Sequence, residues 1–314
     1  MIAFLFPGQG SQKAGMGRAL AEAFPLCRET FEQADAALGD ALGRVIFDGP
    51  DEALTLTENA QPAILTVSIA ALRVLESRGI NPSFVAGHSL GEYSANVAAG
   101  TFAFADAVKI VRKRGRYMQE AVPVGTGAMA AILGLDAERV AQACQEAAQG
   151  EVVSPANING GGQIAIAGHT AAVARAGERA KALGAKRVIP LSVSAPFHCA
   201  LMKPAEDRLA PELRALTTAA PRVPIVANVD ADVKRSAAGA IAALVAQVSS
   251  PVRWEAVVQR LASEGVTTYV EVGPGTVLSG LVKKIHRDAI IMNFGGPEDL
   301  AAVEAAAGCS RPSA

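Results

Sequence analysis

The sequence predicts an α/β protein with a mostly parallel sheet and a smaller subdomain inserted into it. Short apolar segments alternate with longer helical ones toward both ends of the chain, which is the pattern of a parallel α/β sheet. The middle follows the different order β-α-β-β-α-β, which is typical of a ferredoxin-like unit. A chain of 314 residues is long enough to bury a core for both parts.

Residues 1–124 form the first part of the expected large domain. Its longest predicted helix covers 60–77, with Asn59 as the N-cap, Pro62 in the first turn and Gly79 after the end. The expected strands are 2–6 and 83–86, and the other expected helices are 12–23, 28–42, the segment after residue 91 through 99, and 104–120.

Residues 125–193 form the expected inserted ferredoxin-like subdomain. Its predicted strands are 128–133, 152–156, 164–167 and 186–191, and its predicted helices are 137–148 and 171–183. An Asn-Gly-Gly-Gly segment over 159–162 predicts the turn between the second and third strands. The subdomain is therefore a local unit within the larger one.

The large domain resumes over residues 194–308. The predicted helices are 201–216, 239–248, 254–263 and 277–285, and the predicted strands are 225–227, 268–272 and 289–293. This renewed alternation favours strands that join the same parallel sheet as the first part. Residues 309–314 are expected to be a disordered tail.

Composition excludes several classes of protein. A net charge of −1 and a pI of about 6.5 leave no basic excess for nucleic acid or an anionic membrane. Uncharged stretches are broken by Asn, Gln, Pro and Gly, so none predicts a membrane span, and the apolar first residues predict a strand rather than a signal peptide. The four cysteines and four histidines are scattered, which predicts no disulfide framework and no metal site. We expect a cytoplasmic monomer.

A Gly-His-Ser-Leu-Gly segment over 87–91 follows a predicted strand and precedes a predicted helix. This is the setting of a nucleophile elbow, so the large domain is predicted to be α/β-hydrolase-like with Ser89 as its nucleophile. Gly87 and Gly91 allow the sharp turn, and the helix N-terminus favours a developing oxyanion. The alternative is that Ser89 belongs to an ordinary turn between glycines.

A serine nucleophile needs a base, and three histidines are candidates. His88 is adjacent to Ser89, but neighbouring side chains on such a turn usually point apart. His169 begins a predicted helix, where it caps that helix or faces solvent. His198 is in a loop between a strand and a helix, which favours it as the base over a structural loop histidine. No Asp or Glu between Ser89 and His198 stands out as a triad member.

Five motifs, taken in order, resemble those of the malonyl-CoA:acyl carrier protein transacylases, enzymes that load malonyl units for fatty acid synthesis. They are FPGQGSQ at 6–12, GHSLG at 87–91, RGRYMQ at 114–119, APFH at 195–198 and EVGPG at 271–275. The resemblance covers residues 2 to about 296.

The resemblance implies a ping-pong mechanism. Ser89 attacks malonyl-CoA with His198 as general base, and the malonyl-serine intermediate then passes its acyl group to the phosphopantetheine thiol of acyl carrier protein. In this family a main-chain carbonyl orients the histidine, and the matching region makes Gln247 the candidate, which accounts for the missing acid. The oxyanion hole is then formed by the N–H groups of Gln9 and Leu90.

The resemblance also assigns substrate contacts. Arg114 matches the arginine that binds the free malonyl carboxylate, and a planar guanidinium suits a bidentate grip. Its neighbours Arg112, Lys113 and Arg116 are better explained as a solvated helix face. His88, together with the Phe of the APFH motif, matches the malonyl-selective form of the family.

No cofactor is expected, because coenzyme A and phosphopantetheine thioesters act as substrates. A dinucleotide loop that starts at Gly8 would need a third glycine where Lys13 stands, and no Gly-Lys-Ser/Thr motif occurs.

Three weaker signals have two explanations each. Asn157 and Asn159 either line a cleft or belong to a plain hairpin. Cys199 is better explained by packing than as a nucleophile. The basic residues Lys283, Lys284 and Arg287 either help to dock an acidic carrier protein or complement a helix C-terminus.

Alternative functions follow from the same residues. A trans-acting malonyl acyltransferase of a polyketide pathway is hard to separate by motif, and a thioester hydrolase would use water in place of the thiol. A non-catalytic binding protein is disfavoured by the intact set of Ser89, His198 and Arg114.

Overall fold

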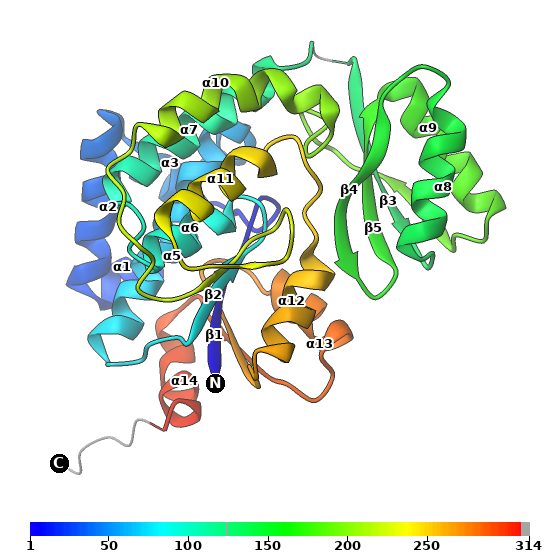
Figure 1. Ribbon diagram of the computed structural model, residues 1–314. Coiled ribbons are helices and arrows are strands. Elements are labelled where there is room, and N and C mark those ends of the chain that lie inside the picture. The colour runs from blue at the N-terminus through cyan, green and yellow to red at the C-terminus, as the bar shows by residue number, and fades with distance from the viewer. Residues whose placement is uncertain (124, 309–314) are drawn as a thin grey trace.

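Two sheets, each covered by helices, make up the computed structural model, which describes residues 1–123 and 125–308 (Figure 1). The larger sheet has six strands in the order β10-β9-β1-β2-β7-β8, and the smaller has four in the order β4-β5-β3-β6. The predicted α/β class is confirmed. The expected tail, 309–314, lies outside the described residues.

The larger sheet is parallel except at one edge. Its parallel strands are β1 (Ile2–Phe6), β2 (Phe84–Gly87), β7 (Ile225–Val226), β9 (Thr268–Val272) and β10 (Ile290–Phe294), and β8 (Val233–Lys234) runs antiparallel to β7. The central strands are buried, which is why β1 and β2 are continuously apolar, although β9 buries Thr268 and Glu271 as well. The two-residue β8 is too short to leave a sequence pattern and was not predicted.

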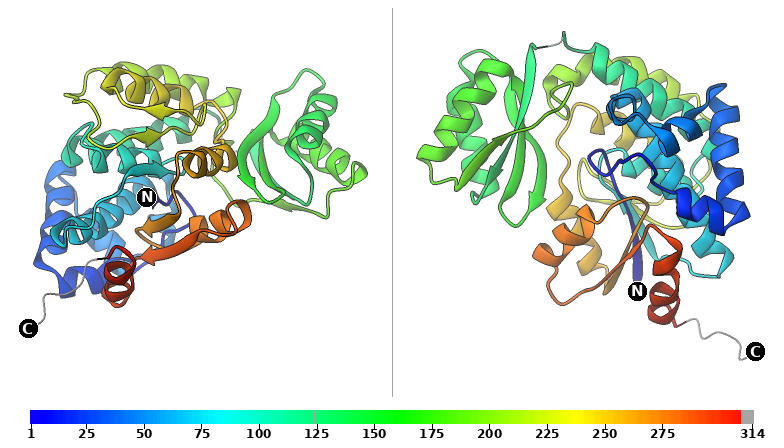
Figure 2. Two further views of the ribbon diagram at one scale, coloured as in Figure 1. Left: turned by 60° about the horizontal axis from the view of Figure 1, so that its bottom comes forward. Right: turned by 180° about the vertical axis from the view of Figure 1, so that it is seen from behind.

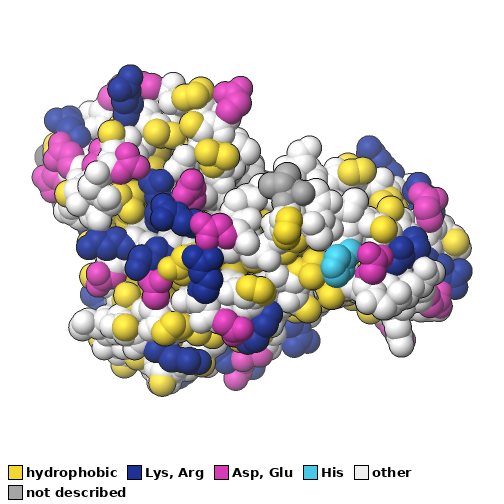
Figure 3. Space-filling view, turned by 90° about the horizontal axis from the view of Figure 1, so that it is seen from above, with side chains coloured by type: hydrophobic (Ala, Val, Ile, Leu, Met, Phe, Trp, Pro, Cys, Tyr) yellow, Lys and Arg dark blue, Asp and Glu magenta, His cyan; other side chains and the backbone are white. Residues whose placement is uncertain are grey.

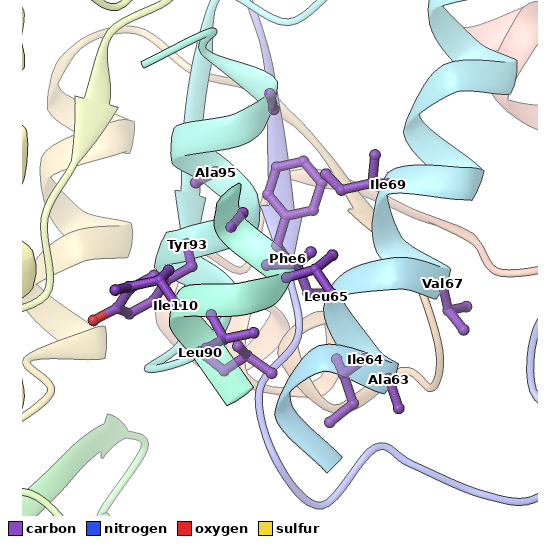
Figure 4. Packing of buried hydrophobic residues seen from close by; sticks show 14 of the residues in the cluster. Phe6, Ala63, Ile64, Leu65, Val67, Ile69, Leu90, Tyr93, Ala95 and Ile110 are labelled. Atoms are coloured by element: carbon purple, nitrogen blue, oxygen red, sulfur yellow. The ribbon is translucent and has the colours of Figure 1, made fainter. Parts of the chain in front are cut away.

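Helices cover both faces of this sheet (Figures 1 and 2). They are α1 (Arg18–Ala23), α2 (Pro25–Leu38), α3 (Leu42–Asp48), α4 (Asp51–Thr55), α5 (Thr57–Ser77), α6 (Gly91–Ala98), α7 (Phe104–Glu120), α10 (Lys203–Arg214), α11 (Ala237–Gln247), α12 (Trp254–Ser263), α13 (Val277–Ile285) and α14 (Leu300–Ala306). The 3₁₀ turns Ala200–Met202 and Pro297–Asp299 precede α10 and α14. Figure 4 shows how Phe6 of β1 packs with Leu65 and Ile69 of α5 and with Leu90, which holds the start of α6 in the main core.

Several helix boundaries differ from the prediction. The helix expected over 12–23 begins only at Arg18, because Gly15 and Gly17 adopt left-handed backbone angles. The long helix α5 begins at Thr57, so Asn59 lies in its first turn and is not its N-cap; its side chain instead donates to the Ala53 carbonyl. The second helix ends at Leu38, where Gly39 is left-handed. Short α3, α4 and α14 were not predicted.

The smaller sheet is antiparallel throughout. Its elements are β3 (Gly127–Leu133), α8 (Ala137–Ala148), β4 (Val153–Gly160), β5 (Gln163–His169), α9 (Thr170–Ala182) and β6 (Arg187–Pro190). This is the predicted β-α-β-β-α-β order, with both helices packed on one face (Figure 1). The turn is confined to Gly161 and Gly162, so β4 extends four residues further than expected. The domain division at residues 125 and 193 stays a prediction.

The smaller sheet meets the large domain along a narrow seam at Val252, which lies in the segment before α12. Ile158 of β4 donates its N–H to the Val252 carbonyl at 2.9 Å, and Val252 donates its own to the Ala156 carbonyl at 2.8 Å. The surface is hollowed between the two lobes, with hydrophobic side chains along the hollow (Figure 3). Asn157, which pairs with Val252 at this seam, also lines the cleft in which the candidate site lies.

Within residues 1–123 and 125–308, every helix is too short or too polar to cross a bilayer. The same residues contain no grouping of His, Cys, Asp and Glu side chains suited to a metal ion.

Candidate active site

Ser89 stands on a strained turn between β2 and α6. Its φ of 52° lies in the left-handed region, which a non-glycine residue adopts only when its surroundings force it. The flanking glycines are required, because a Cβ on Gly91 would lie 1.9 Å from the Phe6 carbonyl oxygen, and one on Gly87 would lie 2.0 Å from Gly91. The local sequence therefore folds as the predicted elbow, with Ser89 Oγ presented at the start of a helix.

His198 is the histidine that reaches Ser89. The distance from Ser89 Oγ to His198 Nε2 is 2.7 Å, and the imidazole is buried. The histidine itself has a left-handed φ of 60°, so a second strained residue faces the first. His198 Nδ1 lies 3.0 Å from the main-chain carbonyl oxygen of Gln247. A carbonyl accepts only, so Nδ1 carries the proton and Nε2 is free to accept the serine proton.

The electrostatic setting keeps this imidazole neutral. Burial lowers the pKa of His198 to about 3, and the nearby positive charge of Arg114 acts in the same direction. The hydrogen bond to the Gln247 carbonyl opposes both effects. A neutral imidazole is the form that a general base requires.

Arg114 of α7 also contacts the Ser89 hydroxyl. Its Nη2 donates to Ser89 Oγ at 3.1 Å and to Gln247 Oε1 at 2.9 Å, while Nη1 donates to Gln61 Oε1 at 2.7 Å. The side chain is completely buried, and its guanidinium lies 5.2 Å from the ring centre of Tyr93. All of its direct hydrogen-bond partners are neutral.

The other basic residues of this helix behave differently. Lys113 pairs with Glu212 and Arg116 with Glu58, both at the surface, and Arg112 pairs with Asp40. The sequence pattern alone did not separate Arg114 from these neighbours, whereas its burial does.

A cavity of about 450 Å³ lies above Ser89 and His198 in the cleft between the lobes. Gln9, His88 and Asn157 are among the residues that line it. The N–H groups of Gln9 and Leu90 donate to no protein acceptor within the described part of the chain. They are therefore available to a bound oxygen.

The His88 side chain bonds to the smaller sheet, although His88 and Ser89 line the same cavity. Its Nε2 lies 2.9 Å from Asn159 Oδ1 on β4, and burial lowers its pKa. Asn159 thus belongs to a strand that contacts the elbow, and Asn157 lines the cavity, so the cleft explanation for both residues is the better one.

Two other candidates lie outside the chemistry. His169 occupies the N-cap position of α9 without a capping hydrogen bond, and its Nδ1 accepts the N–H of Val152. Cys199 is buried, and burial raises the pKa of its thiol to about 11, so it packs as an inert side chain.

Three residues that the sequence did not single out complete the arrangement. Asn228 accepts the N–H of Ser89 at 2.8 Å and donates to the Gly87 carbonyl at 2.7 Å, so it clamps both sides of the turn. Glu92 of α6 accepts from the main chain of Asn228, and Gln61 binds Arg114. Their segments contain other polar residues, such as Asn59 before Gln61 and Ser94 after Glu92, so no local signal marked them.

Comparison with known proteins gives concordant results. The family model described as "Acyl transferase domain" matches residues 3–305. A malonyl CoA-acyl carrier protein transacylase of Escherichia coli K12 is 54% identical over 285 residues, which cover 90% of this chain and 92% of that protein.

Solved structures agree with this result. The crystal structure of an acyl carrier protein S-malonyltransferase from Vibrio cholerae superposes with a TM-score of 0.94 at 48% identity, covering 96% of this chain and 99% of that one. A malonyl-transacylase in complex with a type II polyketide synthase acyl-carrier protein has a TM-score of 0.94 at 48% identity, with coverage of 96% and 98%.

Proposed function

This chain belongs to the acyl transferase domain family, and we propose that it moves a malonyl group from malonyl-CoA to the phosphopantetheine thiol of acyl carrier protein in fatty acid biosynthesis. The observation that carries the proposal is the convergence of His198 Nε2 and Arg114 Nη2 on Ser89 Oγ, at 2.7 and 3.1 Å. One partner accepts the serine proton, and the other offers a positive charge for an acyl group that bears its own carboxylate.

The first half-reaction uses Ser89 and His198. As Oγ attacks the thioester carbonyl, its proton passes to His198 Nε2, and the carbonyl oxygen gains a negative charge that the N–H groups of Gln9 and Leu90 stabilise. The C–S bond then breaks, the imidazolium returns the proton to the departing sulfur, and coenzyme A leaves. The Gln247 carbonyl holds the imidazole in orientation throughout.

The second half-reaction reverses the first with a different thiol. The phosphopantetheine thiol gives its proton to His198 Nε2 and attacks the malonyl-serine ester, after which Ser89 Oγ leaves and recovers the proton. Protons and electrons balance over the cycle with no other reactant, so we propose that the reaction needs no cofactor. We also propose that the chain works as a monomer in the cytoplasm.

Arg114 supplies selectivity for malonyl. A carboxylate is costly to bring into a buried site without a partner, and the guanidinium repays that cost with two parallel hydrogen bonds. To bind it, Arg114 exchanges one of its present partners. Ser89 Oγ is the natural one, since Oγ becomes an ester oxygen in the intermediate and is then a poorer acceptor.

Two neighbouring functions remain as competitors. The relative solved with a polyketide synthase carrier favours testing that carrier as an acceptor as well. A hydrolase would release free malonate from malonyl-CoA in the absence of a carrier.

The test compares malonyl and acetyl transfer in two variants of α7. Arg114→Ala is expected to lower kcat/KM for malonyl-CoA by about a hundredfold while acetyl transfer is retained, because a buried charge-assisted pair contributes roughly 2–3 kcal/mol. The control is Lys113→Ala, which removes a surface cation on the same helix and leaves both rates unchanged. Equal losses for malonyl and acetyl in Arg114→Ala would refute the carboxylate role.

A further inference from the structure

A buried carboxylate beneath the nucleophile has no place in the chemistry described so far. Glu92 lies in the first turn of α6, three residues after Ser89, and is 1% exposed. A buried carboxyl group is expensive, and here burial raises its pKa to about 7. Asn96 of the same helix bonds back to the main-chain carbonyl of Glu92, whereas the Glu92 side chain reaches residues of other segments.

Glu92 is joined to the active site through Gln247. One oxygen, Oε2, accepts the side-chain amide N–H of Gln247 at 2.7 Å and the main-chain N–H of Asn228 at 3.0 Å. The opposite end of the same amide, Gln247 Oε1, accepts from Arg114 Nη2 at 2.9 Å. The amide therefore lies between a carboxyl group and a guanidinium, with each end facing the group that it can bind.

We propose that Glu92 is a positioning residue that fixes the Gln247 amide, so that its oxygen holds Arg114 in place for the malonyl carboxylate. This proposal rests on the proposed function of Arg114. Gln247 has one carbonyl and one amino group on its side chain, and nothing in its own covalent structure decides which of them faces Arg114. Glu92 Oε2 is the nearest acceptor of the amino group, at 2.7 Å, so it turns the amino group away from Arg114 and leaves the oxygen for the guanidinium; the Ser89 carbonyl, at 2.9 Å, acts in the same sense.

The same contact steadies the remaining parts of the site. Gln247 Nε2 also donates to the Ser89 carbonyl at 2.9 Å, and the main-chain carbonyl of Gln247 holds His198. Asn228, the second donor to Glu92, clamps the elbow through its side chain. Since Oε2 accepts both hydrogen bonds whether the carboxyl group is protonated or ionised, the hydrogen-bond acceptor rather than the charge does the positioning.

Two variants separate the acceptor from the charge. Glu92→Met keeps the length of the side chain but removes the acceptor, and Glu92→Gln keeps an acceptor oxygen but removes the charge. The readout is the ratio of kcat/KM for malonyl-CoA to that for acetyl-CoA, with acyl carrier protein as acceptor. Glu92→Met is expected to lower this malonyl-to-acetyl ratio by about tenfold or more, because a misplaced binding group is penalised steeply, whereas Glu92→Gln keeps it within about threefold.

The matched control is Glu271→Met. Glu271 is also 1% exposed, but it accepts from the N–H groups of Leu278 and Ser279 at the start of α13, away from Arg114. Replacement of the Glu271 carboxyl group by Met is expected to lower the thermal unfolding midpoint without changing the malonyl-to-acetyl ratio. This separates a positioning role from a general loss of stability.

Each outcome decides the proposal. An unchanged ratio in Glu92→Met, or an equal fall in Glu92→Gln and Glu92→Met, overturns it. If Glu92→Met does not fold, Glu92→Asp takes its place, since a carboxyl group withdrawn by one methylene can no longer reach Gln247, and the same fall is expected. Arg114→Ala is measured in parallel: if that variant leaves the ratio unchanged, the proposed function of Arg114 fails and this inference with it. If only Glu92→Met leaves it unchanged, the inference alone fails.

Discussion

At the scale of single residues, the site depends on one positive charge and one neutral imidazole that contact the same hydroxyl. Arg114 donates a hydrogen bond to Ser89 Oγ, and His198 accepts one from the same hydroxyl. Until Arg114 binds a carboxylate, its positive charge therefore acts against protonation of the His198 imidazole. A positive charge close to an imidazole disfavours the imidazolium, and this effect adds to burial in lowering the pKa of His198. The basicity of His198 is therefore coupled to what Arg114 binds.

This coupling predicts a shift in pH dependence. In Arg114→Ala the positive charge is gone, so the pKa of His198 rises from about 3 toward its ordinary value, although burial still holds it down. The acid side of the profile of kcat/KM for acetyl-CoA, which reports the free enzyme, is expected to move to higher pH. Rates between pH 4 and 8 measure it, and Lys113→Ala is the control. An acid limb that stays in place or moves to lower pH would contradict the coupling.

The sequence singled out the residues that meet at the site better than the residues that support them. Ser89 could be found from its strand–turn–helix setting, and the loop position favoured His198. Glu92, Asn228 and Gln61 could not be assigned, because their roles follow from contacts between segments that are 53 to 155 positions apart. Hydrogen bonds between such distant positions produce no recognisable residue pattern within a short stretch of sequence.

At the scale of elements, the elbow is a tight junction among β1, β2 and α6. The Phe6 carbonyl at the end of β1 accepts the His88 N–H at 3.0 Å and lies where a Gly91 side chain would be. Helix α6 can begin so close to the sheet only because its first residue has no Cβ.

Substitution of this glycine is expected to be severe. Gly91→Ala places a methyl group 1.9 Å from the Phe6 oxygen, so we expect a loss of more than about 4 kcal/mol in the free energy of unfolding, along with transfer activity. The control is Gly280→Ala in α13, where a Cβ meets nothing within 4 Å; it is expected to stabilise by about 0.5–1 kcal/mol. Urea unfolding of both variants measures the difference, and a Gly91→Ala as stable as the parent would refute this description of the junction.

Helix boundaries were predicted well where the periodic spacing of apolar residues continues without interruption. The bounds expected for 104–120, 137–148, 254–263 and 277–285 agree with α7, α8, α12 and α13. The failure over residues 12–17 has a local cause, since Gly15 and Gly17 allow left-handed angles that break the helix. Short α3, α4 and α14 depend on packing against neighbours, which a sequence pattern does not record.

At the scale of the whole molecule, strand β4 of the smaller sheet contacts two segments of the large domain beside the cleft. Beside the backbone seam at Val252, the Asn159 side chain on β4 reaches His88, the neighbour of Ser89. The smaller sheet thereby supports one wall of the site, which is why Asn157 and Leu191 line the same cavity as Ser89.

Loss of this side-chain contact is expected to affect both stability and catalysis. Asn159→Ala leaves His88 Nε2 without its partner, which costs about 1 kcal/mol in the free energy of unfolding and loosens the cleft, so that malonyl transfer falls by about tenfold. Thermal unfolding and steady-state transfer measure the two effects. The control is Ser154→Ala, half-buried at the other end of the same strand. Asn159→Ala with parental stability and rate would show that the contact does not support the site.

The central claim is that Ser89 carries the malonyl group between the two thiols, and the mass of the acylated protein tests it most directly. Intact mass spectrometry after mixing with malonyl-CoA, without a carrier, followed by peptide mapping, is expected to find one malonyl group on the peptide that contains Ser89. That group should disappear when acyl carrier protein with its phosphopantetheine arm is added, and Ser89→Ala should never acquire it. A malonyl group on another residue, such as Cys199, or rapid release of free malonate with no acylated protein, would contradict the account.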